Sequence, residues 1–180
     1  RRYDEYISAA KENDPTFQPH NLTFGQMYGA FSTYWRDGRI LFGDVAGYGK
    51  TAQGIAAKII WEIHHGKMPT IVFGPNSSKQ VWEAEVRHDY PEPRIRVINS
   101  YDKEALSHLS DQDFVVINYD SLGSPHTREK VMASLRRIKS PGIVLDEGQL
   151  LKGARTRRFK SVKPILDRAA ILNILSYTPF

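Results

Sequence analysis

Residues 43–53 read Gly43-Asp44-Val45-Ala46-Gly47-Tyr48-Gly49-Lys50-Thr51-Ala52-Gln53 and separate an apolar run from an amphipathic pattern. Residues 39–42 before them are a hydrophobic run typical of a strand, and residues 55–63 after them have the apolar spacing of a helix. A glycine-bearing turn between strand and helix directs backbone N–H groups at a bound anion, and glycine lets a phosphate approach closely. The sequence therefore predicts a nucleotide phosphate site, in which Lys50 reaches the β- and γ-phosphates and the Thr51 hydroxyl holds Mg²⁺.

This turn departs from the phosphate-loop pattern G-x-x-x-x-G-K-[ST] at its first position, where Asp44 replaces glycine. The turn alone is therefore compatible with a second interpretation, a glycine-rich connection that binds nothing. A further motif is needed to choose between the two.

The further motif is Ile143-Val144-Leu145-Asp146-Glu147, whose Asp146 lies 96 residues after Lys50. Three apolar residues before two acidic ones are typical of a buried strand that presents carboxylates at its end. Parallel α/β sheets bind ligands at the carboxyl ends of their strands, so Asp146 is expected beside the phosphate loop. There Asp146 can orient Mg²⁺ and Glu147 can polarise an attacking water. The alternative is an exposed acidic pair, but the order and spacing of the two motifs favour nucleotide hydrolysis.

The two motifs carry a family resemblance. Residues 44–53 resemble the D-E-x-G-x-G-K-T-x-Q motif of Snf-type, chromatin-remodeller-like ATPases of helicase superfamily two, and residues 146–153 resemble their D-E-A-H/Q-x-I-K-N motif. Four further matches are Leu22, Gln26 and Gly29 with L-R-x-Y-Q-x-x-G, Pro75, Ser77 and Ser78 with motif Ia, Val115–Asp120 with V-x-T-Y-E, and Leu175–Pro179 with the L-T-G-T-P of motif III. The resemblance covers residues 22–179 in the family's order.

The resemblance implies a role for each matching position. The implied catalytic residues are Lys50, Asp146, Glu147 and Gln149, with Thr51 and Asp146 as metal ligands. The implied nucleotide-binding residues are Gln26, which would read the adenine edge, with Asp44, Ala46, Gly47, Tyr48, Gly49, Lys50, Thr51 and Gln53. The implied DNA contacts are Ser77, Ser78, Lys79, Asn118 and Tyr119, and Ser176 and Thr178 would couple the two sites. Without the resemblance, Ser77 is a helix N-cap and Gln53 an ordinary first-turn residue.

Departures from the family pattern include four positions. Val45 replaces an acidic residue, Gly25 an aromatic one, Gly148 an alanine and Tyr177 a glycine. A tyrosine at position 177 must either adopt a β-type backbone or be strained at positive φ.

Strand and helix patterns alternate along the chain. Strands are expected at residues 39–43, 70–74, 95–98, 114–118, 142–146 and 170–175. Helices are expected near residues 3–12, 26–35, 50–65, 77–88, 102–109, 126–138 and 156–167. Such alternation predicts an α/β fold with a central, mostly parallel sheet and helices on both faces. This is the RecA-like P-loop NTPase lobe that the resemblance implies, with residues 1–21 as a flanking segment, residues 22–180 as lobe 1, and the second lobe absent from this chain.

Composition narrows the class of protein. The 180 residues include 41% hydrophobic residues and no cysteine, which excludes disulfides and thiolate metal sites. No apolar run approaches the roughly 20 residues that span a bilayer, so we expect no membrane contact and an intracellular location, in the cytoplasm, nucleoid or nucleus. The pair His64-His65 is interpreted as a helix end, and Trp35, Trp61 and Trp82 as core or lobe-interface residues.

Positive charge is concentrated after the acidic motif. Seven cations, Lys152, Arg155, Arg157, Arg158, Lys160, Lys163 and Arg168, accompany a single carboxylate, Asp167. This run is either a solvated helix face or a surface that contacts nucleic-acid phosphates.

Together these observations predict the ATP-binding lobe of a DNA-dependent ATPase that uses ATP and Mg²⁺ to move on double-stranded DNA without sequence preference. A nucleoprotein is an additional candidate substrate. Two alternatives remain open: a nucleotide-gated DNA-binding module without turnover, and the motor lobe of a restriction-type helicase. The isolated lobe is expected to be weakly active or inactive, because arginines of a second lobe would complete the ATP site.

Overall fold

The structure is a computed structural model that describes residues 7–8, 11–12, 15, 22–45, 47–89, 93–151, 153 and 156–177, without the side chain of Arg157. Within this part of the chain, the strands are β1 (Arg39–Phe42), β2 (Thr70–Gly74), β3 (Ile95–Val97), β4 (Phe114–Asn118), β5 (Gly142–Asp146) and β6 (Ile171–Leu175). They form one sheet in the order β1-β6-β5-β2-β4-β3, and each neighbouring pair is parallel. The predicted parallel sheet is confirmed.

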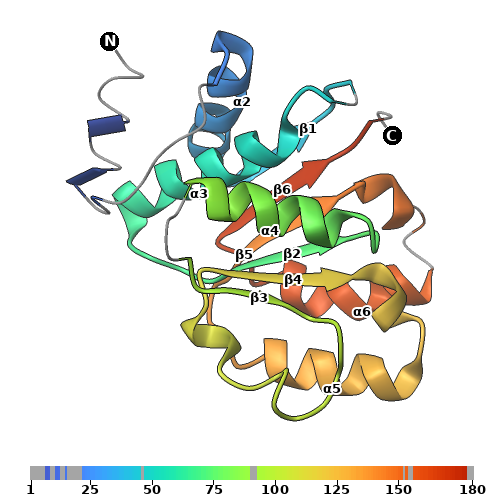
Figure 1. Cartoon of the computed structure of the whole chain (residues 1–180). Helices are drawn as coiled ribbons and strands as arrows, with labels where there is room; N and C mark the ends of the chain where they lie inside the picture. Colours follow the sequence, from blue (N-terminus) through green and yellow to red (C-terminus); the bar gives the residue numbers. More distant parts are fainter. Residues whose placement is uncertain are drawn as a thin grey trace.

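Helices cover both faces of the sheet (Figure 1). One face carries α2 (Phe24–Trp35), α3 (Lys50–His65) and α4 (Ser78–Asp89), and the other carries α5 (Pro125–Leu135) and α6 (Arg157–Leu166). Each face has its own apolar core, the first around Ile55, Ile60 and Trp82 and the second around Phe73 and Ile117. Central strands β2 and β4 are buried on both faces, and for this reason they are continuous apolar runs in the sequence.

The helix ends follow from local chemistry. Helix α2 starts at a capping box, in which the Thr23 hydroxyl accepts from the Gln26 amide and the Gln26 side chain accepts from the Thr23 amide. Helix α3 begins after Gly49 and ends at Gly66, both with positive φ. Its last residues are His64 and His65, as predicted for a helix end.

One predicted helix is wrong. Residues 102–109 form turns, followed by a short 3₁₀ helix, Leu109–Asp111. The Asp102 carboxylate accepts from the Ala105 amide, so the first turn is closed by a side chain. His108 then has a φ of 52°, which an α-helix cannot contain. Of the predicted helix at residues 3–12, only residues 7–8 and 11–12 are described, and these are helical.

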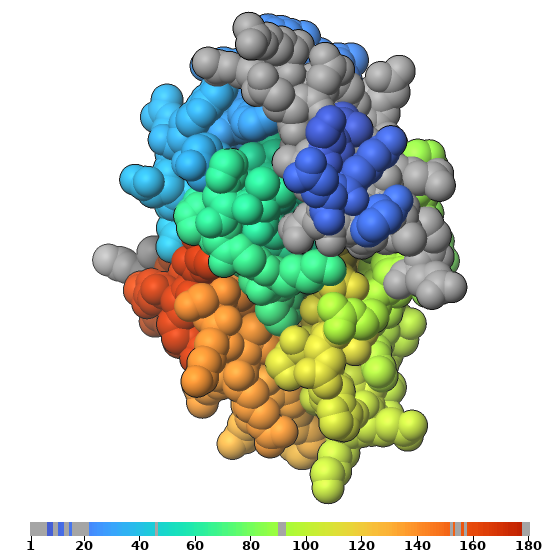
Figure 2. Space-filling view, turned by 90° about the vertical axis from the view of Figure 1, so that its left-hand side faces the viewer, coloured from blue at the N-terminus to red at the C-terminus, as the bar shows by residue number. Residues whose placement is uncertain are grey.

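The described N-terminal residues lie against the first core. In Figure 2 they appear in dark blue beside the surface of α3. Ile7 packs on this core as a partly buried residue. The predicted flanking segment therefore contacts the domain through at least this side chain.

A buried ion pair lies between α3 and the sheet. Lys58 and Glu62 are 2% and 7% exposed, and their Nζ and Oε1 atoms are 2.7 Å apart. Lys58 Nζ also lies 5.1 Å from the centre of the Phe114 ring, and Glu62 Oε1 accepts from the Met68 amide at 2.8 Å. The two charges thus neutralise each other, and each has a further partner inside the core.

Candidate active site

The phosphate loop and the acidic motif meet at the carboxyl edge of the sheet. They line one cleft of about 410 Å³, to which Gly47, Gly49, Lys50, Thr51, Pro75, Ser77, Ser78, Val81, Glu85, Asp146 and Glu147 contribute. The meeting follows from topology, because β1 and β5 both pair with β6 and all three run in the same direction. The predicted convergence of Lys50 with Asp146 and Glu147 is therefore present.

The phosphate loop is curved by two glycines. Gly47 and Gly49 have φ values of 78° and 72°, a region that side chains rarely adopt. A Cβ on Gly49 would also lie 2.5 Å from Gln26 Nε2. The Lys50 ammonium lies inside the curve, where it donates to the carbonyls of Asp44 at 2.9 Å and Val45 at 3.1 Å.

Two glutamines fix the phosphate loop by hydrogen bonds to Tyr48 and Asp44. Gln26 Nε2 donates to the Tyr48 carbonyl at 2.7 Å, and buried Gln53 donates from Nε2 to Asp44 Oδ2 at 3.0 Å. Glycine at position 25 has a local reason, because a Cβ there would lie 2.9 Å from the Tyr48 hydroxyl. The end of the Tyr48 side chain therefore lies next to Gly25, the position at which the family pattern has an aromatic residue.

Asp146 is held by three neighbours. Its Oδ2 accepts from the Trp82 indole N–H at 3.0 Å, its carboxylate accepts from the Ser78 hydroxyl, and its backbone carbonyl accepts from the Tyr119 hydroxyl at 2.8 Å. Burial raises the pKa of the Asp146 carboxyl, while the Ser78 and Trp82 hydrogen bonds act in the opposite direction. Burial and the nearby acids also raise the pKa of Tyr119, which therefore stays a hydrogen-bond donor. The side chain of Asp146 is fixed in direction before any ligand arrives.

Glu147 is linked to the end of β6 by a series of side chains. Gln149 Nε2 donates to Glu147 Oε2, and the Ser176 hydroxyl donates to Gln149 Oε1 at 2.8 Å. Glu147 directly follows β5 and has a φ of 50°, a left-handed conformation that is costly for a residue other than glycine. The backbone therefore leaves the strand direction at this residue. The two hydrogen bonds of Gln149 connect the Glu147 carboxylate with the residue that follows β6.

Comparison with known proteins identifies the family. The family model for the SNF2-related domain matches residues 30–180. This chain belongs to the SNF2-related family. It is an ATPase lobe of the SNF2 type, as the resemblance implied.

Individual relatives agree with this assignment. One relative is the SWI/SNF-related matrix-associated actin-dependent regulator of chromatin subfamily A-like protein 1 of Xenopus laevis. The SNF2-related chain is 30% identical to it over 149 residues, which cover 80% of this chain and 14% of that protein. It is 26% identical to the DNA annealing helicase and endonuclease ZRANB3 of Bos taurus, over 91% of this chain and 14% of that protein. The chain thus spans about a seventh of these curated relatives.

Solved structures agree as well. The Sulfolobus solfataricus SWI2/SNF2 ATPase core in complex with dsDNA superposes with a TM-score of 0.69 at 25% identity, over 91% of this chain and 34% of that chain. The Sulfolobus solfataricus SWI2/SNF2 ATPase core domain has the same fold, with a TM-score of 0.70 at 24% identity, over 92% of this chain and 34% of that chain.

The predicted DNA contacts of this SNF2-related lobe are not all on its surface. Ser77 is exposed at the cleft, but Ser78 is buried against Asp146. Lys79 is 7% exposed, and its Nζ donates to Asn99 Oδ1 at 3.1 Å, so burial lowers the pKa of this ammonium.

The second predicted DNA-contact segment is also engaged internally. Asn118 Oδ1 accepts from the Ser121 amide at 2.9 Å and so caps the short helix Tyr119–Leu122. Tyr119 is 2% exposed beneath Asp146, and its side chain offers no surface to DNA. In this structure Ser78 and Tyr119 serve the acidic motif of the ATP site.

Some predicted residues lie outside the described residues. They are Ala46 of the phosphate loop, Thr178 of motif III, and the cations Lys152 and Arg155, with the side chain of Arg157. Tyr177 is described and is absent from the residues with positive φ, so the strained alternative for this position is wrong.

Trp82 is a site residue that sequence reasoning missed. The sequence predicts core or lobe-interface packing for it, and the side chain is fully buried in the core, but its N–H also donates to the Asp146 carboxylate. The available signal was its spacing four residues after Ser78, because residues at i and i+4 lie on one face of a helix. A buried indole also needs an acceptor for its N–H.

The donor set fits a magnesium nucleotide. Thr51 and Asp146 both line the cleft and supply a hydroxyl and a carboxylate, the hard oxygen ligands that Mg²⁺ prefers. Apart from its two chain neighbours, no described residue has a heavy atom within 4 Å of a Cβ built on Gly47, so this side of the loop is open. Among the described residues, no group of three or more His, Asp or Glu side chains could form a separate metal site.

Within the described chain, no helix has both the length and the apolar character needed to cross a bilayer.

Proposed function

We propose that this lobe is the first RecA-like lobe of a motor that couples ATP hydrolysis to movement along double-stranded DNA. The observation that carries the proposal is the hydrogen-bonded series from Glu147 through Gln149 to Ser176. It connects the carboxylate next to the cleft with the end of β6, where motif III begins. Such a connection suits a protein in which events at a second site alter hydrolysis.

The proposed chemistry assigns one task to each residue of the cleft. The backbone N–H groups at the start of α3 and the Lys50 ammonium bind the phosphates of ATP. Thr51 and Asp146 would hold Mg²⁺, which neutralises charge on the phosphates when bound. Glu147 polarises a water that attacks the γ-phosphorus, the bond to the bridging oxygen of ADP breaks, and Glu147 takes up the water's proton.

The DNA and the second lobe complete the proposal. A relative of similar fold was solved as an ATPase core in complex with dsDNA, and this chain covers 34% of it. Exposed Ser77, next to the N-terminus of α4, can contact a backbone phosphate, which carries no sequence information. A second lobe would supply arginines across the cleft, worth about 10³–10⁵-fold in rate, so the lobe alone should turn over slowly.

Lys50→Ala tests the phosphate loop. The variant should bind a fluorescent ATP analogue with Mg²⁺ about 10- to 100-fold more weakly, since it loses a charged hydrogen-bond donor. Fluorescence anisotropy of the lobe measures this directly. The control is Lys67→Ala, an exposed lysine between α3 and β2. Equal affinity of the Lys50→Ala variant and the parent chain would refute the phosphate site.

Trp82→Phe tests the support of Asp146. Phenylalanine fills most of the space but has no N–H, so the carboxylate loses a hydrogen bond that directs it. The apparent affinity for Mg²⁺, measured by titrating the metal at fixed nucleotide analogue, should fall about 10-fold, with metal-free nucleotide binding within about 2-fold. Trp61→Phe, on the half-buried Trp61 of α3, should change neither. Equal losses with and without metal would assign Trp82 a purely structural role.

A further inference from the structure

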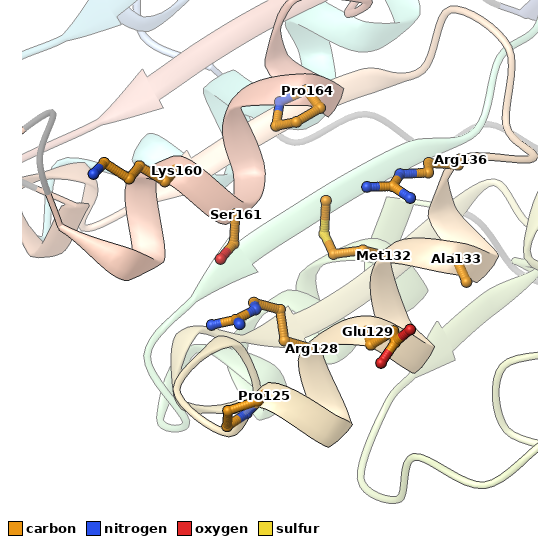
Figure 3. A pocket seen from close by; sticks show the side chains of 9 residues that line it. All are labelled: Pro125, Arg128, Glu129, Met132, Ala133, Arg136, Lys160, Ser161 and Pro164. Carbon is orange, nitrogen blue, oxygen red and sulfur yellow. The ribbon is translucent and has the colours of Figure 1, made fainter.

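A second groove lies on the opposite face of the sheet, between α5 and α6. Its volume is about 670 Å³, larger than that of the nucleotide cleft. Figure 3 shows the side chains that α5 and α6 contribute to it. The proposed ATP chemistry uses none of them.

The groove is positively charged. Its lining includes Arg128 of α5, Arg136 directly after α5, and Lys160 of α6. Glu129 is the one carboxylate among the lining residues. Arg128 is half-buried, and among the described residues no carboxylate pairs with any of these three cations.

Neighbouring cations of α6 behave differently. Arg158 pairs with Asp120 at 3.0 Å, and Lys163 pairs with Asp167 at 2.6 Å. The seven-cation run is therefore neither a uniform solvated face nor a uniform phosphate surface. Part of its charge is neutralised internally, and Lys160 contributes its charge to the groove.

The floor of the groove is a core side chain. Met132 is 4% exposed and lies at the centre of the lining residues (Figure 3). The walls are therefore fixed by the apolar core beneath them, and the cations of α5 and α6 project from a rigid support.

We propose that the α5–α6 groove binds an extended, acidic segment of a partner protein. Carboxylates of the segment pair with Arg128, Arg136 and Lys160. The groove lies on the face of the sheet opposite α4, whose N-terminus adjoins the proposed DNA contact Ser77, so this second ligand is expected to be separate from that DNA. Arg136 follows the last residue of α5 and lies eight residues after Arg128, about 12 Å away at helical rise, a distance that an extended chain spans in about four residues.

The test uses amide NMR spectra of the isotope-labelled 180-residue chain. The probe is a synthetic peptide with glutamate at every fourth position and threonine between, a composition that favours extended chain, at concentrations up to about 1 mM. We expect shifts confined to α5 and α6. The variant Arg128→Glu/Arg136→Glu should weaken binding about tenfold or more. The control variant Lys130→Glu/Arg137→Glu should bind the peptide with an affinity within about twofold of the parent chain. It makes the same change in charge as the first variant, but at neighbouring exposed positions that do not line the groove.

Three results would overturn the proposal. Equal binding of the same peptide with glutamine in place of glutamate would remove the role of charge. A DNA duplex that shifts the α5 and α6 signals when the peptide does not would make the groove a nucleic-acid surface. Unchanged α5 and α6 signals with both probes would show that the groove is no binding site. In each case, the amide signals of residues outside the groove show whether a variant is folded.

Discussion

Replacing Glu147 by glutamine is expected to lower ATP turnover about 10²- to 10⁴-fold in a protein that carries both lobes, with nucleotide binding unchanged. The amide keeps the size of the side chain, but it cannot take up a proton from water. It can still hydrogen-bond to Gln149, so the connection to Ser176 is preserved. The affected step is therefore hydrolysis alone.

Single-turnover hydrolysis with DNA present, together with analogue binding, measures the two quantities separately. Glu83→Gln is the matched control, because this glutamate is exposed on α4 and pairs with Arg87. A variant that hydrolyses ATP normally would remove Glu147 from the mechanism. A variant that loses hydrolysis but retains DNA-dependent function would favour the nucleotide-gated module over the motor.

Removing one partner of the buried Lys58–Glu62 pair is expected to destabilise the fold strongly. Glu62→Ala leaves a buried ammonium and a Met68 amide without their acceptor, at a cost of about 3–5 kcal/mol in the free energy of unfolding. Urea denaturation of the 180-residue chain measures this cost. Glu83→Ala breaks a pair with the same i, i+4 spacing, but that pair is exposed and should cost at most about 1 kcal/mol.

The double variant Lys58→Met/Glu62→Leu separates charge from packing. Because both charges are removed together, the double variant should recover most of the stability that Glu62→Ala loses. It should remain about 1–3 kcal/mol less stable than the parent chain, because the Met68 amide still lacks its acceptor. A Glu62→Ala cost below about 1 kcal/mol would contradict the prediction, since it would mean that water reaches Lys58.

The accuracy of the sequence-based predictions varied for physical reasons. Strands β2, β4 and β5 were predicted to the residue, because a strand buried on both faces is an uninterrupted apolar run between polar ends. Helix α3 was also predicted to the residue, since it lies between Gly49 and Gly66, whose positive φ values end a helix. The predicted helix at residues 102–109 failed because the Asp102 side chain and the φ of His108 outweighed two leucines at helical spacing.

The sequence by itself determined the order of the motifs, the type of fold and the convergence of Lys50 with Asp146 and Glu147. These follow from local patterns and from the rule that parallel strands end at one edge. It did not determine which way the side chains near that edge point.

Only the tertiary structure decided that Ser78, Trp82 and Tyr119 support Asp146, and that Gln149 joins Glu147 to Ser176. These contacts join residues that are far apart in the sequence. Tyr119 is 27 residues and Trp82 is 64 residues from Asp146, and Ser176 is 27 residues from Gln149. They depend on strand register and on the rotation of α4 against the sheet. The periodic spacing of residues shows which side chains share a face, but it does not show which side chain on another segment that face meets.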